Sequence, residues 1–169
     1  GDVTSSATNA IVPIITQNKI PTISPSASDP ALTGASPYFA RVWPSDVFEA
    51  AVIAKYAKDA GLQSIAIVYV NNDYGQGMVQ AFEHEFAKEH IAFKAPVAEG
   101  FSNFRPLLQR IVSSSADGVF LVAFPETIRS FLTQAFEIGF DLPVLATASS
   151  EDNIVATAPL SENLVFAAP

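Results

Sequence analysis

Three short polar segments of the sequence have the residue types and positions to bind a small ligand. The first is Thr4-Ser5-Ser6, which opens a helix expected over residues 6–18. Backbone N–H groups at a helix N-terminus and the helix dipole favour an anion, and hydroxyl groups add hydrogen-bond donors without bulk or a competing charge. These residues are suited to hold a carboxylate; the alternative is that they only cap the helix.

The second and third segments each follow an expected strand. Ser26-Ala27-Ser28 comes after a strand at residues 21–24 and offers small hydroxyls and open backbone; the alternative is an ordinary turn rich in Ser, Asp and Pro. Asn72-Asp73-Tyr74-Gly75 follows a strand at residues 65–70, and Tyr74 could present its ring and hydroxyl to a ligand. The alternative here is a capping Asp beside a tyrosine that packs at the helix start.

Strand-like and helix-like patterns alternate along the chain. Apolar runs of strand length are followed by segments whose apolar residues recur every three or four positions. This alternation predicts an α/β fold, a Rossmann-like parallel sheet flanked by helices, with strands buried on both faces. Ligands bind such sheets at the carboxyl ends of the strands, near which the polar segments lie. The expected helices cover residues 6–18, 45–60, 76–90, 104–112 and 125–139, and the expected strands 21–24, 64–70, 93–99, 118–122 and 142–145.

Composition and missing motifs narrow the function. The 169 residues carry a net charge of −8 with only nine basic residues, which argues against nucleic acid as a partner. The sequence has no cysteine, no glycine-rich phosphate loop and no G-x-S-x-G elbow, and His84 and His90 do not share a helical face. We therefore expect a binding protein without cofactor or metal; the rival is a doubly wound α/β enzyme with an acid pocket.

The order and spacing of these segments resemble the type I periplasmic binding proteins, in the branch that binds leucine, isoleucine, valine and related amino acids. A serine pair opens a helix, an isoleucine-proline step enters the next strand, and S-P-S-A-S-D-P-A-L-T follows from Ser24. Arg41, Asp46 and Glu49 then stand like the family's R…D…Q, and residues 72–77 like its D-Y-G-x-G. The similarity covers essentially the whole chain.

The resemblance implies two Rossmann-like lobes joined by a hinge, with the ligand in the cleft between them. Residues 1–40 would be the C-terminal part of an incomplete first lobe and residues 41–169 most of the second, so that the chain is an internal fragment of a protein about twice as long. In this family the serines at Ser5 and Ser6 hold the ligand carboxylate, and Tyr74 closes from the other lobe. The segment Ser26-Ala27-Ser28 is expected to contact the polar head of the ligand.

Two positions depart from the family pattern. An aromatic residue commonly follows the strand G-V-F-L-V, but Ala123 stands there, with Phe124 beside it. The acidic residue that balances a ligand ammonium is replaced by Ala148, and Glu151 or Asp152 could substitute only if the loop shifts. A buried ammonium without a partner is costly, so a carboxylate ligand lacking the amine suits these residues better.

The resemblance implies an extracytoplasmic solute-binding protein of an ABC transporter. It would bind a branched-chain or other amino acid, or a related organic acid, and pass it to the membrane permease; a sensor domain of the same fold is the alternative. The expected location is periplasmic or otherwise extracytoplasmic, with the signal segment outside this chain. With half of lobe one missing, Ile11, Ile14 and Ile15 would be exposed, which predicts that the isolated chain dimerises or binds ligand poorly.

Overall fold

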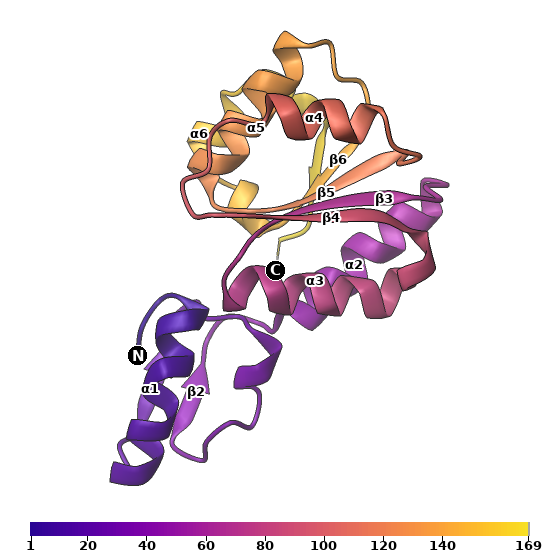
Figure 1. Cartoon of the computed structure of the whole chain (residues 1–169). Coiled ribbons are helices and arrows are strands. Elements are labelled where there is room, and N and C mark those ends of the chain that lie inside the picture. Colours follow the sequence, from indigo (N-terminus) through magenta and orange to yellow (C-terminus); the bar gives the residue numbers. More distant parts are fainter. Residues whose placement is uncertain (169) are drawn as a thin grey trace.

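The chain forms two units, each built around its own parallel sheet (Figure 1). A computed structural model describes residues 1–168. In the smaller unit, β1 pairs with β2, and Val12, Ala27 and Leu32 form a small buried core. Its elements are α1 (Ser5–Asn18), β1 (Thr22–Ser24), the 3-10 helix η1 (Pro30–Leu32) and β2 (Phe39–Arg41).

The larger unit is a five-stranded parallel sheet with helices on both faces, which confirms the expected α/β fold. The strand order is β4-β3-β5-β6-β7. Its strands are β3 (Ile65–Val70), β4 (Ile91–Val97), β5 (Gly118–Val122), β6 (Val144–Ala146) and β7 (Leu164–Phe166). Its helices are α2 (Asp46–Asp59), α3 (Asp73–Phe86), α4 (Arg105–Val112), α5 (Pro125–Glu137) and α6 (Asn153–Ala156), with 3-10 turns η2 (Lys88–His90), η3 (Ala148–Ser150) and η4 (Ser161–Asn163).

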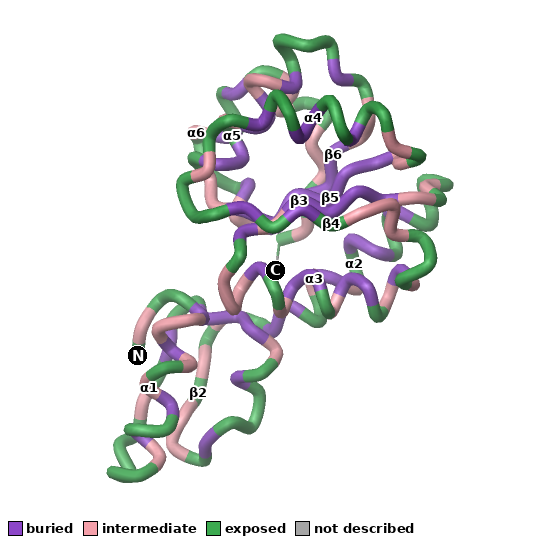
Figure 2. Tube along the Cα trace, viewed as in Figure 1, coloured by how far each residue is buried: buried purple, intermediate pink, exposed green. Residues whose placement is uncertain are grey.

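The apolar strands separate two buried layers. Along β3, Ile65 and Ile67 pack in the layer beneath α2 and α3, whereas Ala66 and Val68 pack in the layer beneath α4, α5 and α6. Successive side chains of a strand point to opposite faces, so a strand covered on both sides must be apolar throughout. Figure 2 shows the result as continuous burial along the central strands.

Several element boundaries differ from the expected ones. The third helix begins at Asp73 rather than near residue 76, and Asn72, not an aspartate, caps it by accepting the Gly75 N–H at 3.0 Å. Tyr74 therefore lies in the first helical turn. Strand β4 begins at Ile91, ahead of the expected start. Helix α6 and strand β7 of the larger unit were not predicted from the sequence patterns. Within residues 1–168, no helix combines the length and apolar character needed to cross a membrane.

The two units meet where α1 approaches the N-terminus of α3 (Figure 1). The Asn9 side-chain amide donates hydrogen bonds to the carboxylates of Asp29 at 2.6 Å and Asp73 at 2.8 Å. Gly77 leaves room for this contact, because a Cβ atom there would lie 2.8 Å from Asp29 Oδ1. These interactions place the start of α1 beside the carboxyl ends of the large sheet.

Candidate functional site

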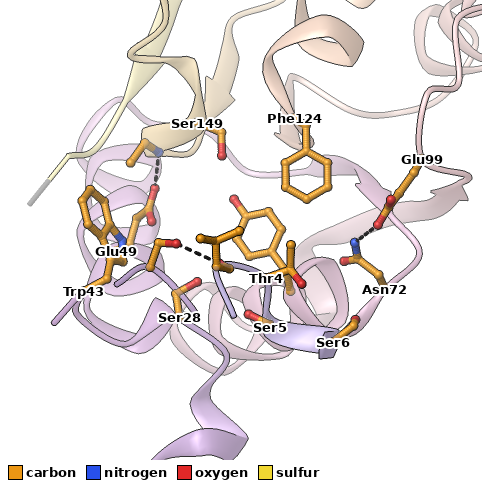
Figure 3. Close-up of a pocket in the computed structure, with 14 residues that line it drawn as sticks. Thr4, Ser5, Ser6, Ser28, Trp43, Glu49, Asn72, Glu99, Phe124 and Ser149 are labelled. Carbon is orange, nitrogen blue, oxygen red and sulfur yellow. Dashed lines mark hydrogen bonds between the residues drawn. The ribbon is translucent and has the colours of Figure 1, made fainter. Parts of the chain in front are cut away.

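A cavity of about 500 Å³ opens where the two units meet (Figure 3). The loops after β3, β4, β5 and β6 reach it, together with the N-terminus of α1 and the first turn of α2. Its wall thus combines the carboxyl edge of the large sheet, where ligands bind in such folds, with a helix N-terminus from the smaller unit. The lining residues are Val3, Thr4, Ser5, Ser6, Ser26, Ser28, Trp43, Glu49, Asn72, Tyr74, Glu99, Phe124, Ala148 and Ser149.

The first turn of α1 offers several hydrogen-bond donors to this cavity. Thr4 is the N-cap, so Ser5 and Ser6 are the first two helical residues. The Ser5 hydroxyl oxygen accepts the Asp29 N–H at 3.2 Å, and the Ser6 hydroxyl oxygen accepts the Asp73 N–H at 3.1 Å. Because each oxygen already accepts a hydrogen bond, each hydroxyl proton remains to be donated.

The backbone of the same turn adds to this set. Within residues 1–168, the N–H groups of Ser5 and Ser6 have no hydrogen-bond acceptor. Such unsatisfied groups carry the positive end of the helix dipole, and an anion in front of them is stabilised. Two N–H and two O–H donors therefore lie on one helical turn beside the cavity, an arrangement that suits a carboxylate.

The Ser26-Ala27-Ser28 segment is brought to the cavity only in part. Ser26 lines it and is exposed, and its hydroxyl donates to the Val3 carbonyl at 2.8 Å. Ser28 also lines it and is buried. Ala27 points instead into the core of the smaller unit and is not a lining residue.

Aromatic rings form the opposite wall. Tyr74 and Phe124 stack with ring centroids 5.7 Å apart, and Trp43 lines the side next to Ser28 (Figure 3). The Tyr74 hydroxyl donates to Thr147 Oγ1 at 2.7 Å, and burial raises the pKa of this phenol above its usual range. Of the two residues that the sequence suggested for the aromatic position after β5, Phe124 lines the cavity. Ala123 is fully buried in the core and does not line it.

Glu49 is a lining residue that the sequence reasoning did not assign to the site. It extends from the first turn of α2, and its Oε1 accepts the backbone N–H of Ala148 at 2.5 Å (Figure 3). Burial raises the pKa of Glu49 to about 7, and the Asp46 carboxylate one turn earlier adds to the shift. The Glu49 carboxylate of α2 thus reaches the loop after β6, where Ala148 stands in place of the family's acidic residue.

Asp46 lies behind Glu49 and is almost fully buried. Neither of its carboxylate oxygens has a hydrogen-bond partner within residues 1–168, and burial raises the pKa of this group to about 7. In the sequence, Asp46 and Glu49 are three residues apart at the start of an expected helix. This spacing puts both side chains on one helical face, and it could have predicted that two carboxyl groups lie together beside the site.

Other polar residues that follow the strands differ in whether they line the cavity. Asn72 Nδ2 donates to Glu99 Oε1 at 2.5 Å, which joins the loops after β3 and β4 at the far side of the cavity. Glu151 and Asp152, considered as replacements for the missing acid, are not lining residues; Asp152 caps α6 by accepting the Ile154 N–H at 2.9 Å.

Comparisons with known proteins agree with this architecture. The family model described as "Receptor family ligand binding region" matches residues 1–151. A Leu/Ile/Val-binding protein homolog of Brucella abortus is 32% identical over 117 residues, covering 66% of this chain and 29% of that protein. Glutamate receptor 3.1 of rice (Oryza sativa subsp. japonica) is 26% identical over 144 residues, covering 82% of this chain and 15% of the receptor.

Solved structures of binding proteins show the same fold. The leucine binding protein LivK of Thermotoga maritima has a TM-score of 0.81 and 25% identity, over 93% of this chain and 47% of that one. LivJ of Streptococcus pneumoniae, solved with isoleucine, has a TM-score of 0.77 and 24% identity, over 89% of this chain and 43% of that one. A solute binding protein of R. palustris, solved with benzoate, has a TM-score of 0.83 and 21% identity, over 93% and 45%.

These matches are to binding proteins and receptors, the class that the sequence predicts. The chain spans less than half the length of each of these relatives. With the family model covering 151 of its 169 residues, the chain belongs to the receptor family ligand binding region family, the type I periplasmic binding protein fold.

Proposed function

We propose that the protein is an extracytoplasmic solute-binding protein of an ABC transporter that binds an amino acid or a related organic acid in the cavity between its two units. The observation that carries this proposal is the first turn of α1, where the N–H and O–H groups of Ser5 and Ser6 border the cavity and donate to no acceptor within residues 1–168. Such a set of donors stabilises a carboxylate. The cavity volume is in the range of small-molecule sites.

The roles of the lining residues follow from their chemistry. Ser5 and Ser6 bind the carboxylate of the ligand, and Ser26 and Ser28 contact its polar head. Tyr74 and the stacked Phe124 pack against its apolar part. Most of the contact area comes from the rings, while the hydroxyls set the orientation, as is usual in small-molecule sites.

The relatives support both the ligand class and the transport role. One is a Leu/Ile/Val-binding protein homolog, and structures of the same fold hold isoleucine or benzoate. In this proposal residues 1–40 belong to the first lobe and residues 41–169 to the second. The protein works outside the cytoplasm and passes its ligand to the membrane permease of the transporter.

A fluorescence titration tests the binding site. Trp43 is the single tryptophan of the chain and lines the cavity, so its emission reports occupancy. Amino acids, keto acids and aromatic carboxylates are titrated, and thermal shifts are measured in parallel. We expect saturable binding of at least one carboxylate that is lost in Ser5→Ala plus Ser28→Ala.

The matched control is Ser130→Ala, which removes a serine hydroxyl that donates to the Glu126 carbonyl within α5 and does not line the cavity. It should bind as the unaltered protein does. Circular dichroism establishes that all variants are folded. Failure of every carboxylate to bind, or equal binding by the double variant, would refute the proposed site.

A ligand-binding sensor domain is the second candidate, and the similarity to rice glutamate receptor 3.1 favours it. Both candidates bind a carboxylate, so binding alone does not separate them. Uptake of the bound solute into membrane vesicles that carry the permease distinguishes the transporter role from the sensor role. Stimulated uptake supports the transporter role, and binding without any stimulation supports the sensor.

A further inference from the structure

Acidic side chains line the cavity, and among residues 1–168 no basic side chain lines it with them. Of its fourteen lining residues, Glu49 and Glu99 are acidic, and none is Lys, Arg or His. Glu99 is exposed at the rim, where water stabilises its charge, and it accepts a hydrogen bond from Asn72. Glu49 is half-buried and therefore depends more on its surroundings.

The surroundings of Glu49 leave its charge largely uncompensated. One oxygen accepts the Ala148 N–H, and within residues 1–168 no side chain donates a hydrogen bond to either oxygen. The four ion pairs in this part of the chain all lie elsewhere, and Arg41 donates to the Asp29 carbonyl and to Thr33. A carboxylate in such a place is costly unless a cation pairs with it.

The neighbouring carboxylate sharpens this requirement. Asp46 stands one helical turn before Glu49 and is almost fully buried; within residues 1–168 neither of its carboxylate oxygens has a hydrogen-bond partner within 3.5 Å, although the Ser28 side chain lies near enough to lower its pKa. Two carboxyl groups of one turn thus share a wall in which, among residues 1–168, no basic side chain lines the cavity; the Arg41 guanidinium lowers the pKa of Asp46 but does not outweigh its burial. Burial raises the pKa of both groups to about 7. A cationic group in the cavity would relieve this repulsion, and a second anionic group would increase it.

The two ends of the site therefore differ in sign. The first turn of α1 presents N–H and O–H donors, and Glu49 presents a negatively charged carboxylate (Figure 3). We propose that Glu49 pairs with an ammonium group of the ligand, so that the protein selects zwitterionic amino acids over carboxylates that lack the amine. This inference rests on the proposed function and reverses the preference that Ala148 suggested in the sequence.

Matched ligand pairs test the inference. Each pair is an amino acid and the same carbon skeleton without its amine: leucine and 4-methylpentanoate, isoleucine and 3-methylpentanoate, phenylalanine and 3-phenylpropanoate; benzoate is added as an aromatic acid. Affinities come from calorimetry and from Trp43 emission. We expect the preferred amino acid to bind more tightly than its partner acid by a factor on the order of tenfold or more, because only the amino acid has an ammonium group that pairs with the half-buried Glu49 carboxylate.

The variant Glu49→Gln keeps the shape of the side chain and an oxygen that can accept the Ala148 N–H, but removes the charge. It should lose the discrimination, with a weaker affinity for the amino acid and an equal or stronger affinity for the acid. The control Glu99→Gln neutralises the other lining carboxylate and should preserve the ratio. Calorimetry of the acid alone shows that each variant still has a working site.

The outcomes separate this inference from the proposed function. Equal or tighter binding of the acids by the unaltered protein, or an unchanged ratio in Glu49→Gln, overturns the role of Glu49 while the carboxylate site stands. Binding of none of the probes overturns the proposed function and the inference together. Loss of discrimination in Glu49→Gln, with the ratio preserved in Glu99→Gln, supports both.

Discussion

Asn9 makes the most informative contact between the two units, and replacing it with alanine tests how they are joined. Its amide donates to one carboxylate oxygen each of Asp29 and Asp73, at 2.6 and 2.8 Å. Asp29 is buried, while Asn9 and Asp73 are half-buried. Asn9→Ala removes both hydrogen bonds and leaves two carboxylates facing one another without a shared donor.

The magnitude follows from the number and kind of these bonds. A hydrogen bond to a charged group contributes about 1.5–3 kcal/mol, and partial exposure favours the lower part of this range. Two such bonds amount to about 3–4 kcal/mol. Alanine forms helix better than asparagine and recovers about 0.6 kcal/mol. We expect Asn9→Ala to lower the free energy of unfolding by about 2–3 kcal/mol, a large share of the stability of a small protein.

Urea denaturation followed by circular dichroism measures this difference, and Asn18→Ala is the matched control. Asn18 lies on the same helix, and its amide donates only to the Ile14 carbonyl at 2.9 Å in an exposed position. Its replacement should change the free energy of unfolding by about 0.5 kcal/mol or less. Equal effects of the two replacements, or full additivity of Asn9→Ala with Asp73→Ala, would show that the bridge does not join the units.

Three further predictions concern packing, pH and association. Gly75→Ala should unfold the protein or destabilise it by more than about 3 kcal/mol, because the new Cβ would lie 1.8 Å from the Val70 carbonyl oxygen; thermal denaturation measures this. Since the pKa of Asp46 is raised to about 7, its contribution to stability is present below about pH 4 and is lost as the pH rises through 7. The urea midpoint should therefore fall between about pH 4 and pH 8, and fall less in Asp46→Asn; identical profiles would contradict this. Ile14 and Ile23 are 57% and 62% exposed, so a dimer of the chain seen by light scattering should dissociate in Ile14→Glu plus Ile23→Glu, and a monomeric parent would refute the expected association.

The exposed apolar residues of α1 show how far helical periodicity alone can be trusted. The sequence led us to expect Ile11, Ile14 and Ile15 on one exposed face. Ile14 is exposed, but Ile15 is buried and Ile11 is half-buried. Adjacent residues of a helix point about 100° apart, so the packing of α1 on the small sheet decides which of two neighbours turns inward.

The parallel α/β fold was predictable because its evidence is local. An apolar run such as Ile65–Val70 has one stable environment, a strand covered on both faces, and an alternation of strands and helices has one sheet geometry. The same reasoning placed the polar segments near the carboxyl edge of the sheet, where Ser5, Ser28 and Tyr74 line the cavity. The short α6 and β7 escaped prediction because so few residues carry too weak a periodicity.

By itself, the sequence determined the α/β class and the polar segments that border the cavity, since periodicity and strand ends are written in neighbouring residues. Only the tertiary structure decided which side chains meet. Glu49 reaches the N–H of Ala148 across 99 positions, and Asn9 reaches Asp73 across 64. No local pattern records such distances, because they depend on how α1 and α2 pack against the large sheet. That packing brings the Glu49 carboxylate of α2 to the loop in which Ala148 stands in place of an acidic residue. For this reason the ligand that we propose is a zwitterionic amino acid rather than a carboxylate without an amine.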